Sequence, residues 1–439
     1  MTPEVSHKWL CERADGLSSL SFPKAFPWVG LALLLVLGGT QGASQALAED
    51  VRGQGVAERQ YEDFSAPGVR LGSFVLRPSL TVSETYDSNV FAASTGAQDD
   101  VVTNINPNVT LTSDWSNHEV RLEADINQSL YARHDDENVM DWRVSASGRI
   151  DVLSTTSLRG SVAYATLSEE RGATDAIGNA AEPTEFTEAA LSLGVRQEFN
   201  RLSGDVSAIY TELDFDDTPL IGGGVSDNDD RDRSLLEVAV EIGYELVADT
   251  VVFLRGTYNT RDYDLKPPAV ALNRDSDGYQ LVAGSRFELG SLARGEVFAG
   301  YQEQEFDNPL FAPVSGIAFG ASVDWFVTPL TTLRFTADSA IEDTNSGTAS
   351  SFERMQAGVG LDHEFLRNLV ASADFAYAQE TFQGSNRKDE VYVYDLGLNY
   401  LIDRNFTIGA FVGLEERTSN VLADGFKRET VGIRVRSAL

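Results

Sequence analysis

The chain has 439 residues and a formal net charge of −33, from 67 acidic and 34 basic side chains. This acidic balance excludes a nucleic-acid-binding protein, which needs a basic surface. The mean hydropathy of −0.19 excludes a helical membrane protein, but it allows a membrane barrel, whose interior is polar. The single cysteine, Cys11, excludes a disulfide framework and a thiolate metal cluster.

The N-terminal residues have the pattern of an export signal. Lys24 precedes an apolar run at 26–37, and small residues flank a cleavage point after Ala48. The apolar run is too short for a membrane-spanning helix. We therefore predict a signal peptide at residues 1–48. Residues 49–69 are polar and read as a periplasmic N-terminal lead-in, too short to form a folded plug.

From residue 70 onward, apolar side chains alternate with small or polar ones in segment after segment. A period of two is typical of β-strands, whose side chains point alternately to two faces. A single hairpin of this kind fits a soluble sandwich, with the apolar face inward, as well as an outer-membrane barrel, with that face towards lipid. The expected strands are 74–86, 103–115, 119–133, 141–152, 157–167, 184–199, 202–215, 234–247, 250–262, 278–289, 293–306, 316–327, 331–341, 352–365, 369–382, 390–402, 406–418 and 427–439.

The connections between these strands favour the barrel. Short connections, such as Asn200-Arg201 and 403–405, alternate with long ones, such as 168–183 and 216–232. Outer-membrane barrels have short periplasmic turns and longer outside loops, whereas a sandwich has no reason to sort its loops. We therefore predict an all-β fold: a transmembrane antiparallel up-and-down β-barrel of roughly 18 strands at residues 70–439, in the bacterial outer membrane.

Aromatic residues on the outward face form two groups, as expected for the girdles at the two membrane interfaces. Those near the short turns are Trp115, Phe199, Tyr244, Trp325, Phe365, Tyr400 and Phe406. Those near the long loops are Tyr86, Tyr164, Tyr210, Tyr258, Tyr279, Tyr301, Tyr377 and Tyr392. The expected partners are therefore outer-membrane lipid and lipopolysaccharide. The final strand alternates up to Leu439, as in outer-membrane proteins whose last strand is read by the barrel-assembly machinery. We therefore expect that machinery as a further partner, and we expect no nucleic acid.

Charged residues of both signs fall on the inward face. The candidate lumen-lining residues are Arg121, Glu123, Arg149, Glu241, Arg255, Arg286, Arg334, Asp362 and Arg434. Rows of charge shape the field that a solute crosses in a pore. The simpler interpretation is that they pair neighbouring strands of a wide barrel. Selection of a solute by these charges is the more specific of the two hypotheses, and strand pairing is the simpler one.

The outside loops are acidic, and the loop at 216–232 contains Gly222-Gly223-Gly224, which would let it bend inward. The candidate constriction residues are Asp216, Asp217, Asp227, Asp229 and Asp230. Because the lead-in is short, we expect any narrowing of the lumen to come from such outside loops. Carboxylate clusters also suit hard cations. None of these loops has an EF-hand spacing, so we predict no metal site.

Catalytic residues are not indicated. Past the predicted signal peptide the chain has three histidines, His118, His134 and His363, and it has no Gly-x-Ser-x-Gly or paired-histidine metal motif. We therefore predict that the protein is not an enzyme and needs no cofactor.

The first expected strand and loop carry a family resemblance. The segments Leu76-Arg77-Pro78-Ser79-Leu80 and Glu84-Thr85-Tyr86-Asp87-Ser88-Asn89-Val90-Phe91 resemble the opening of the putative β-barrel porin 2 family of Gram-negative bacteria. The resemblance implies a link to exopolysaccharide or capsule production, and with it a polysaccharide export apparatus as partner. It brings no site residues. The expected function is therefore a conduit for exported polysaccharide. The alternatives are a general diffusion porin for small hydrophilic solutes and a structural or adhesive surface barrel.

Overall fold

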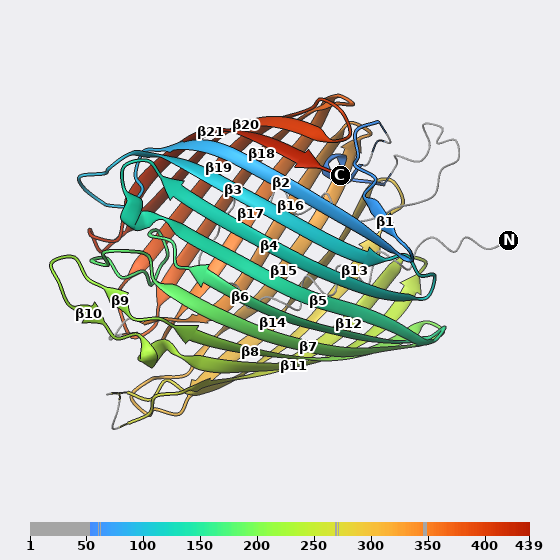
Figure 1. The fold of residues 1–439 in the computed structure, drawn as a ribbon. Helices are drawn as coiled ribbons and strands as arrows, with labels where there is room; N and C mark the ends of the chain where they lie inside the picture. Colours follow the sequence, from blue (N-terminus) through green and yellow to red (C-terminus); the bar gives the residue numbers. More distant parts are fainter. Residues whose placement is uncertain (1–52, 60, 62, 268–269, 271, 346–348) are drawn as a thin grey trace.

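The structure, a computed structural model, describes residues 53–59, 61, 63–267, 270, 272–345 and 349–439, so the expected signal peptide lies outside the described residues. One antiparallel sheet closes on itself to form a barrel (Figure 1). Eighteen strands make the wall, and the short β1 (Val69–Leu71) adds one more beside β2. The predicted all-β barrel and its strand number are confirmed.

The wall strands follow one another around the barrel in chain order. They are β2 (Phe74–Asp87), β3 (Asp100–Ser113), β4 (His118–Tyr131), β5 (Val139–Leu153), β6 (Thr156–Ser168), β7 (Glu185–Phe199), β8 (Leu202–Phe215), β11 (Arg233–Val247), β12 (Thr250–Tyr263), β13 (Ser276–Glu288), β14 (Ala293–Phe306), β15 (Val314–Thr328), β16 (Thr331–Asp343), β17 (Ser351–Leu366), β18 (Leu369–Phe382), β19 (Lys388–Leu401), β20 (Phe406–Ser419) and β21 (Phe426–Ala438).

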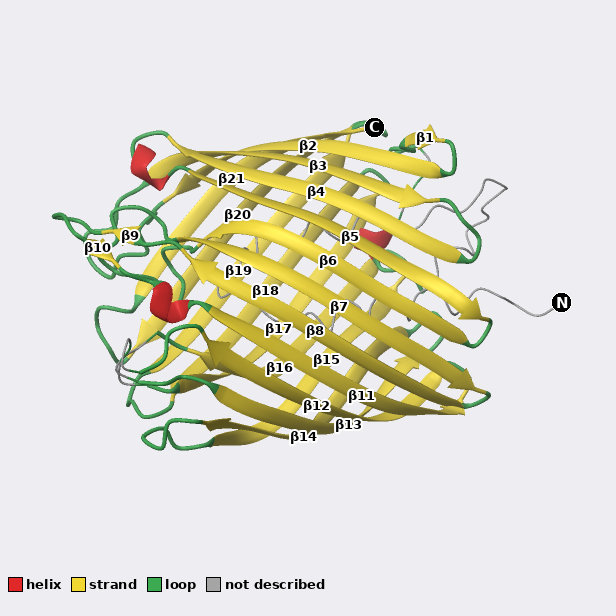
Figure 2. Ribbon diagram, turned by 60° about the horizontal axis from the view of Figure 1, so that its bottom comes forward, coloured by secondary structure: helices red, strands yellow, loops and turns green. Residues whose placement is uncertain are grey.

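The connections differ sharply between the two ends of the barrel. Figure 2 shows the long loops, with the short helices η3 (Asp135–Glu137) and η4 (Asp229–Arg231), at one end. The short turns lie at the other end, close to the helix η2 (Val56–Glu58). Among the described residues, no helix has the length and apolar character needed to cross a membrane.

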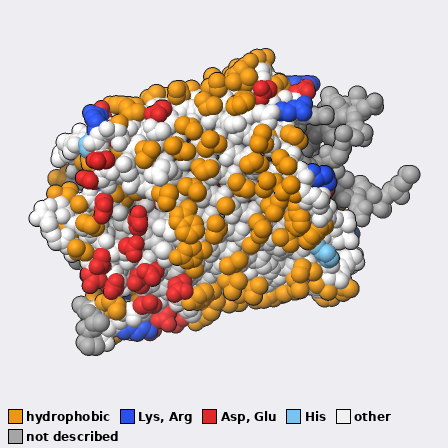
Figure 3. Space-filling model, viewed as in Figure 1, with side chains coloured by type: hydrophobic (Ala, Val, Ile, Leu, Met, Phe, Trp, Pro, Cys, Tyr) orange, Lys and Arg blue, Asp and Glu red, His pale blue; other side chains and the backbone are white. Residues whose placement is uncertain are grey.

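The outward face of the wall is apolar, as the period of two predicts. Val240, Leu396 and Ile433 point outward from three different strands and are 47%, 55% and 60% exposed. Figure 3 shows that hydrophobic side chains cover the middle of the barrel, while carboxylates gather towards the long-loop end. In water such a surface would cost free energy, so it fits a surface that faces the hydrocarbon of a membrane.

Tight turns close the short end of the barrel. Asn200 and Asp249 have φ values of 58° and 61°, in the left-handed region. Asn and Asp tolerate this conformation better than most residues because their short polar side chains can hydrogen-bond locally. Each turn therefore reverses the chain within about two residues. The pair β7–β8 keeps its register up to the turn, whereas β11–β12 has a register shift between Glu245 and Val247.

The barrel closes between its first and last wall strands. β2 pairs with β21 from Ser79, opposite Ala438, to Asp87, opposite Thr430. β21 therefore does not reach the first residues of β2. The strand β1 pairs there instead, with Val69 opposite Leu76, so the edge of β2 that β21 leaves free is covered by the segment that precedes it.

Candidate functional site

The lumen wall from β11 to β14 carries a closed network of two arginines and two carboxylates. Arg255 lies 2.7 Å from Glu241 and 2.9 Å from Glu296. Arg286 lies 3.3 Å and 2.7 Å from the same two carboxylates. The Arg255 guanidinium also lies 4.7 Å from the centre of the Phe253 ring. Because each charge has two partners of opposite sign, the network ties strands together and leaves little net charge for a solute.

The other predicted lumen charges are paired too, except for Arg434. Arg334 lies 2.6 Å from Asp362 and 2.7 Å from Asp374. Two pairs form within single strands, Arg121 with Glu123 at 2.9 Å and Arg149 with Asp151 at 3.1 Å. Arg434 instead donates to the neutral amide oxygen of Asn399, at 2.8 Å. The pairing supports the simpler interpretation for most of these charges, and selection by them stays a prediction.

The loop between β6 and β7, residues 169–184, crosses the long-loop end of the lumen. Thr174 donates to Glu380 on β18, at 2.9 Å. Asp175 accepts hydrogen bonds from the Thr344 hydroxyl at 2.7 Å and from the Asn345 backbone at 3.2 Å, beyond the end of β16. In the order of strands around the barrel, β16 to β18 lie opposite β6 and β7. The loop is therefore fixed to the far wall and divides the opening.

Ion pairs hold the near end of this loop as well. Glu169 pairs with Arg231 at 2.7 Å, and both side chains are 5% exposed. The Arg231 guanidinium also lies 4.1 Å from the centre of the Phe215 ring. Arg171 pairs with Glu137 at 2.5 Å. Buried pairs of this kind hold a loop in one position, because removing either partner leaves the other charge unpaired and away from water.

The expected constriction loop, 216–232, does not cross the lumen in this way. Its strands β9 (Thr218–Pro219) and β10 (Val225–Ser226) pair with each other, and Gly222, Gly223 and Gly224 form the tip. The carboxylates predicted to narrow the pore, Asp216, Asp217, Asp227, Asp229 and Asp230, are solvent-exposed, and none of them lines the three cavities described below. Self-pairing and a bridge from Leu220 to Ala180 hold this loop as a hairpin beside the β6–β7 loop, and constriction by its carboxylates stays a prediction.

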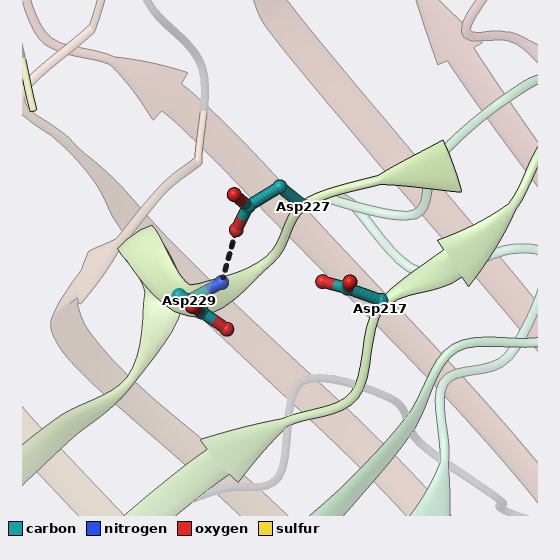
Figure 4. A group of neighbouring side chains, drawn as sticks. All are labelled: Asp217, Asp227 and Asp229. Carbon is teal, nitrogen blue, oxygen red and sulfur yellow. Dashed lines mark hydrogen bonds between the residues drawn. The ribbon is translucent and has the colours of Figure 1, made fainter. Parts of the chain in front are cut away.

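Three of these aspartates come together. Figure 4 shows Asp217, Asp227 and Asp229 with their carboxylates turned towards one another, and one oxygen from each lies within 4.8 Å of the others. Asp227 accepts the backbone N–H of Asp229 at 3.1 Å. The neighbouring Asp227 carboxylate, with others around it, raises the pKa of Asp229. Exposed carboxylates of this kind are common without a bound ion, and the cluster alone assigns none.

The described residues of the lead-in between 53 and 69 lie inside the short-turn end of the barrel, contrary to the expectation that only outside loops narrow the lumen. The Val56 backbone donates to the Thr332 hydroxyl on β16, at 3.0 Å. Arg59 pairs with Glu364 on β17 at 2.9 Å, with both side chains almost fully buried. Tyr61 donates to the same carboxylate at 2.6 Å. The wall of the barrel therefore supplies the partners that hold this short segment in the lumen.

The residues that the structure describes line three sizeable cavities inside the barrel. The large cavity, of ≈750 Å³, lies between the β6–β7 loop and the wall, and the middle cavity, of ≈430 Å³, lies beside the lead-in. These two share the lining residues Ser79, Asp395, Phe411, Arg434 and Arg436. They are therefore adjacent along the wall of β19, β20, β21 and β2, and we call the two cavities together the conduit. The small cavity, of ≈260 Å³, is lined by the Arg255 network on the other wall.

Sequence patterns could have pointed to both narrowing segments. Residues 169–184 carry four acidic side chains and one arginine, whereas 216–232 carries six acidic side chains and one arginine. The loop with fewer charges has less to desolvate when it packs inside the lumen. The lead-in contains Val56 and Tyr61. Burial of these side chains costs less hydration free energy than burial of the polar residues around them.

Comparisons with solved structures give weak similarities to outer-membrane proteins. The OccK2 (OpdF) protein of Pseudomonas aeruginosa is 10% identical over 84% of this chain and 98% of that one, with a TM-score of 0.46. The siderophore receptor PiuA of Acinetobacter baumannii is 11% identical over 85% and 82%, with a TM-score of 0.47. The ferric enterobactin receptor PfeA of P. aeruginosa is 9% identical over 83% and 80%, with a TM-score of 0.45. No curated protein matches the chain.

The family comparison is more specific. A family model described as putative beta-barrel porin 2 matches residues 62–439, which is the whole barrel and the end of the lead-in. The match covers the apolar belt, the two unequal ends and the closed wall of eighteen strands described above. The predicted resemblance and the outer-membrane location are thereby confirmed. The chain belongs to the putative β-barrel porin 2 family, and it is a porin-like β-barrel of the bacterial outer membrane.

Proposed function

We propose that this barrel is a passive channel for small hydrophilic solutes, and that they cross through the conduit. The observation that supports this proposal is the adjacency of the large and middle cavities, which together extend from the β6–β7 loop to the lead-in along one wall. An 18-stranded barrel is wide enough for an aqueous channel. The two inserted segments reduce that width without filling it.

Export of a polysaccharide, the expectation from the family resemblance, is the weaker proposal for this geometry. A polymer needs an unobstructed path, but the β6–β7 loop is hydrogen-bonded to the opposite wall through Thr174 and Asp175. The lead-in is fixed by the buried Arg59–Glu364 pair at the other end. Both segments would have to leave the lumen before a chain of sugars could pass. A purely adhesive role leaves the conduit unexplained.

The partners that we propose follow from the surface. The apolar belt would contact outer-membrane lipid, and the long-loop end of the barrel would contact lipopolysaccharide. The alternating outward residues of β21, such as Val431 and Ile433, are 54% and 60% exposed and suit recognition by the barrel-assembly machinery.

Liposome swelling tests the proposed function. Vesicles that contain the refolded protein are diluted into isotonic glucose, a disaccharide and a dextran polymer. We expect swelling with glucose, slower swelling with the disaccharide and none with dextran, since the conduit admits solutes by size. Vesicles that exclude every sugar would contradict the channel proposal and favour an adhesive barrel. Passage of dextran as fast as glucose would favour polymer export.

A further inference from the structure

We propose that the conduit contains a binding site for an oxyanion, the carboxylate or phosphate group of a small solute, formed by Arg434 and Arg436 on β21 with Arg77 on β2. The inference deepens the proposed channel function and rests on it. It names the class of solute that the conduit would bind during passage.

The three arginines follow one another along the conduit. Arg434 and Arg436 are two residues apart on β21, so they share its inward face, and both line the large and the middle cavity. Arg77 lines the middle cavity, nearer the short turns. In register with β2, Arg434 lies opposite Ser83 and Arg436 opposite Thr81. From Ser83 to Arg77 is about 20 Å of strand, so the charges are spread along the path.

These arginines differ from the other lumen arginines in their partners. Arg255 and Arg334 each have two carboxylates within 3 Å. Within the described part of the chain, Arg77, Arg434 and Arg436 make no ion pair, and Arg434 donates to the neutral Asn399. An unpaired guanidinium in a half-buried position reduces stability. A chain of net charge −33 has many carboxylates with which it could neutralise them, and this wall places none within ion-pair distance.

Two unmatched polar atoms mark one position on this wall. The Nε of Arg436 and the hydroxyl oxygen of Thr81 are both buried and have no hydrogen-bond partner. They belong to residues that lie opposite each other on β21 and β2. The Nε atoms of six other described arginines are also without a hydrogen-bond partner, so this position is distinguished by the unmatched hydroxyl opposite an arginine that has no ion pair. Because both atoms lie below the surface of the wall, an oxyanion in the conduit would accept hydrogen bonds from the terminal N–H groups of the guanidinium, which are arranged as a fork.

The space beside the arginines suits a small solute. The wall leaves room for Arg434 because Gly409 faces it: a Cβ at Gly409 would come within 2.7 Å of the Arg434 Nε. The middle cavity, of ≈430 Å³, falls in the usual range for small-ligand sites, which is roughly 300–1,000 Å³. A sugar acid or a sugar phosphate has both the size for this space and the group that the arginines would bind.

Anion block in planar bilayers tests the inference. The full-length mature protein conducts potassium chloride while sodium phosphate, sodium glucuronate or neutral glucose is added at constant ionic strength. We expect a saturable fall in current with phosphate or glucuronate and none with glucose. The anion that blocks at the lower concentration identifies the preferred group. Equal, unsaturable effects of all three additives would overturn the inference.

Variants connect the block to the named side chains. Arg434→Gln with Arg436→Gln should abolish the saturable block. The matched control is Arg159→Gln, which removes a lumen arginine paired with Asp205 at 2.7 Å on the other wall; its block should equal that of the unaltered protein. Arg436→Lys keeps the charge but loses the fork, so it should keep the anion preference of the current and weaken the block about tenfold or more, since a bidentate contact is lost. A block unchanged in the double variant would overturn the inference.

Calorimetry in detergent separates this inference from the channel proposal. Phosphate or glucuronate is titrated into the folded barrel, and folding of each variant is checked by heat-modifiable migration in gels. Saturable heat that disappears in the double variant supports the binding site even if the barrel conducts no ions, in which case the channel proposal alone fails. Conduction without arginine-dependent heat or block overturns the binding site and leaves the channel proposal standing.

Discussion

At the scale of single residues, the direction of a side chain decides whether a charge is tolerated. Val431 and Thr430 are neighbours near the middle of β21. Val431 points outward and is 54% exposed, whereas Thr430 lines the large cavity. An arginine on the lipid-facing side of a barrel loses its hydration, and an arginine in the lumen keeps it.

We expect Val431→Arg to lower the free energy of folding into lipid by about 1 kcal/mol, the cost of a cation near the edge of the apolar belt, because Val431 lies opposite Tyr86 of the girdle near the long loops. Thr430→Arg, the matched control, should fold nearly as well as the unaltered chain. Urea titrations in lipid vesicles, followed by tryptophan fluorescence, measure the difference. Equal stabilities would mean that the inward and outward faces of β21 are assigned the wrong way round.

The ionisation of Glu170, in the β6–β7 loop, should make ion selectivity depend on pH. Burial raises the pKa of this carboxyl to about 7, with Glu415, Asp141 and Asp87 adding to the rise and Arg428 opposing it. A folded-state pKa above the ordinary value means that the docked loop is favoured at low pH, when Glu170 is protonated. This contribution to stability is lost as the pH rises through the pKa that Glu170 has in the folded state.

We therefore expect the cation preference of the current to increase as the pH rises from about one unit below this pKa to one unit above it. Glu170→Gln should remove that increase while the conductance at low pH stays the same. Reversal potentials in a salt gradient measure the preference. An equally steep pH dependence in the variant would assign the titration to another group.

At the scale of elements, the two inserted segments set the width of the lumen. A shortened β6–β7 loop, without residues 172–181, should give a larger single-channel conductance because Thr174 and Asp175 no longer attach it to the opposite wall. Removing 220–230 from the neighbouring hairpin should leave the conductance nearly unchanged, since its aspartates line none of the cavities. The opposite ranking of the two deletions would restore the hairpin as the constriction.

Glu364 contacts two residues of the lead-in, Arg59 and Tyr61. A second ion pair joins the lead-in to the wall, between Glu58 and Arg294. Glu364→Gln removes the buried pair with Arg59, and loss of a partner in such a pair costs about 3–5 kcal/mol. We expect the lead-in to leave the lumen and to become sensitive to protease added from the periplasmic side. Glu198→Gln, which alters the more exposed pair with Arg196 at 3.2 Å, is the control. Equal protease resistance of both variants would show that the lead-in is held by other contacts.

At the scale of the whole molecule, the two ends face different compartments. An epitope inserted at Gly222, where a Cβ meets open space, should bind antibody on intact cells. The same epitope at Asn200, in a short turn, should bind only after the cells are opened. Flow cytometry with and without permeabilisation compares them. Labelling of Asn200 on intact cells would reverse the orientation of the barrel.

The sequence predicted the wall far better than the contents of the lumen. Strands such as β19 and β20 are predicted from the alternation of apolar and polar side chains at adjacent residues. Counting such segments along the chain gives the number of strands. The positions of Thr174 and Arg59 depend on partners about 200 and 300 residues away, and no local pattern encodes such distances. The glycines at 222–224 indicated a bend correctly, but a bend can serve a hairpin as well as a constriction.

The seam between β2 and β21 also determines how the barrel must fold. Every other wall pair joins wall strands that follow each other in the chain. At the seam, Ser79 pairs with Ala438, near the opposite end of the chain. Loop closure over such a span is entropically costly and slow compared with forming hairpins. Closure of the seam should therefore be the last step of folding, and until then β2 and β21 present unpaired edges that invite aggregation. Since β1 already covers part of β2, the nascent sheet leaves less of that edge open to a wrong partner.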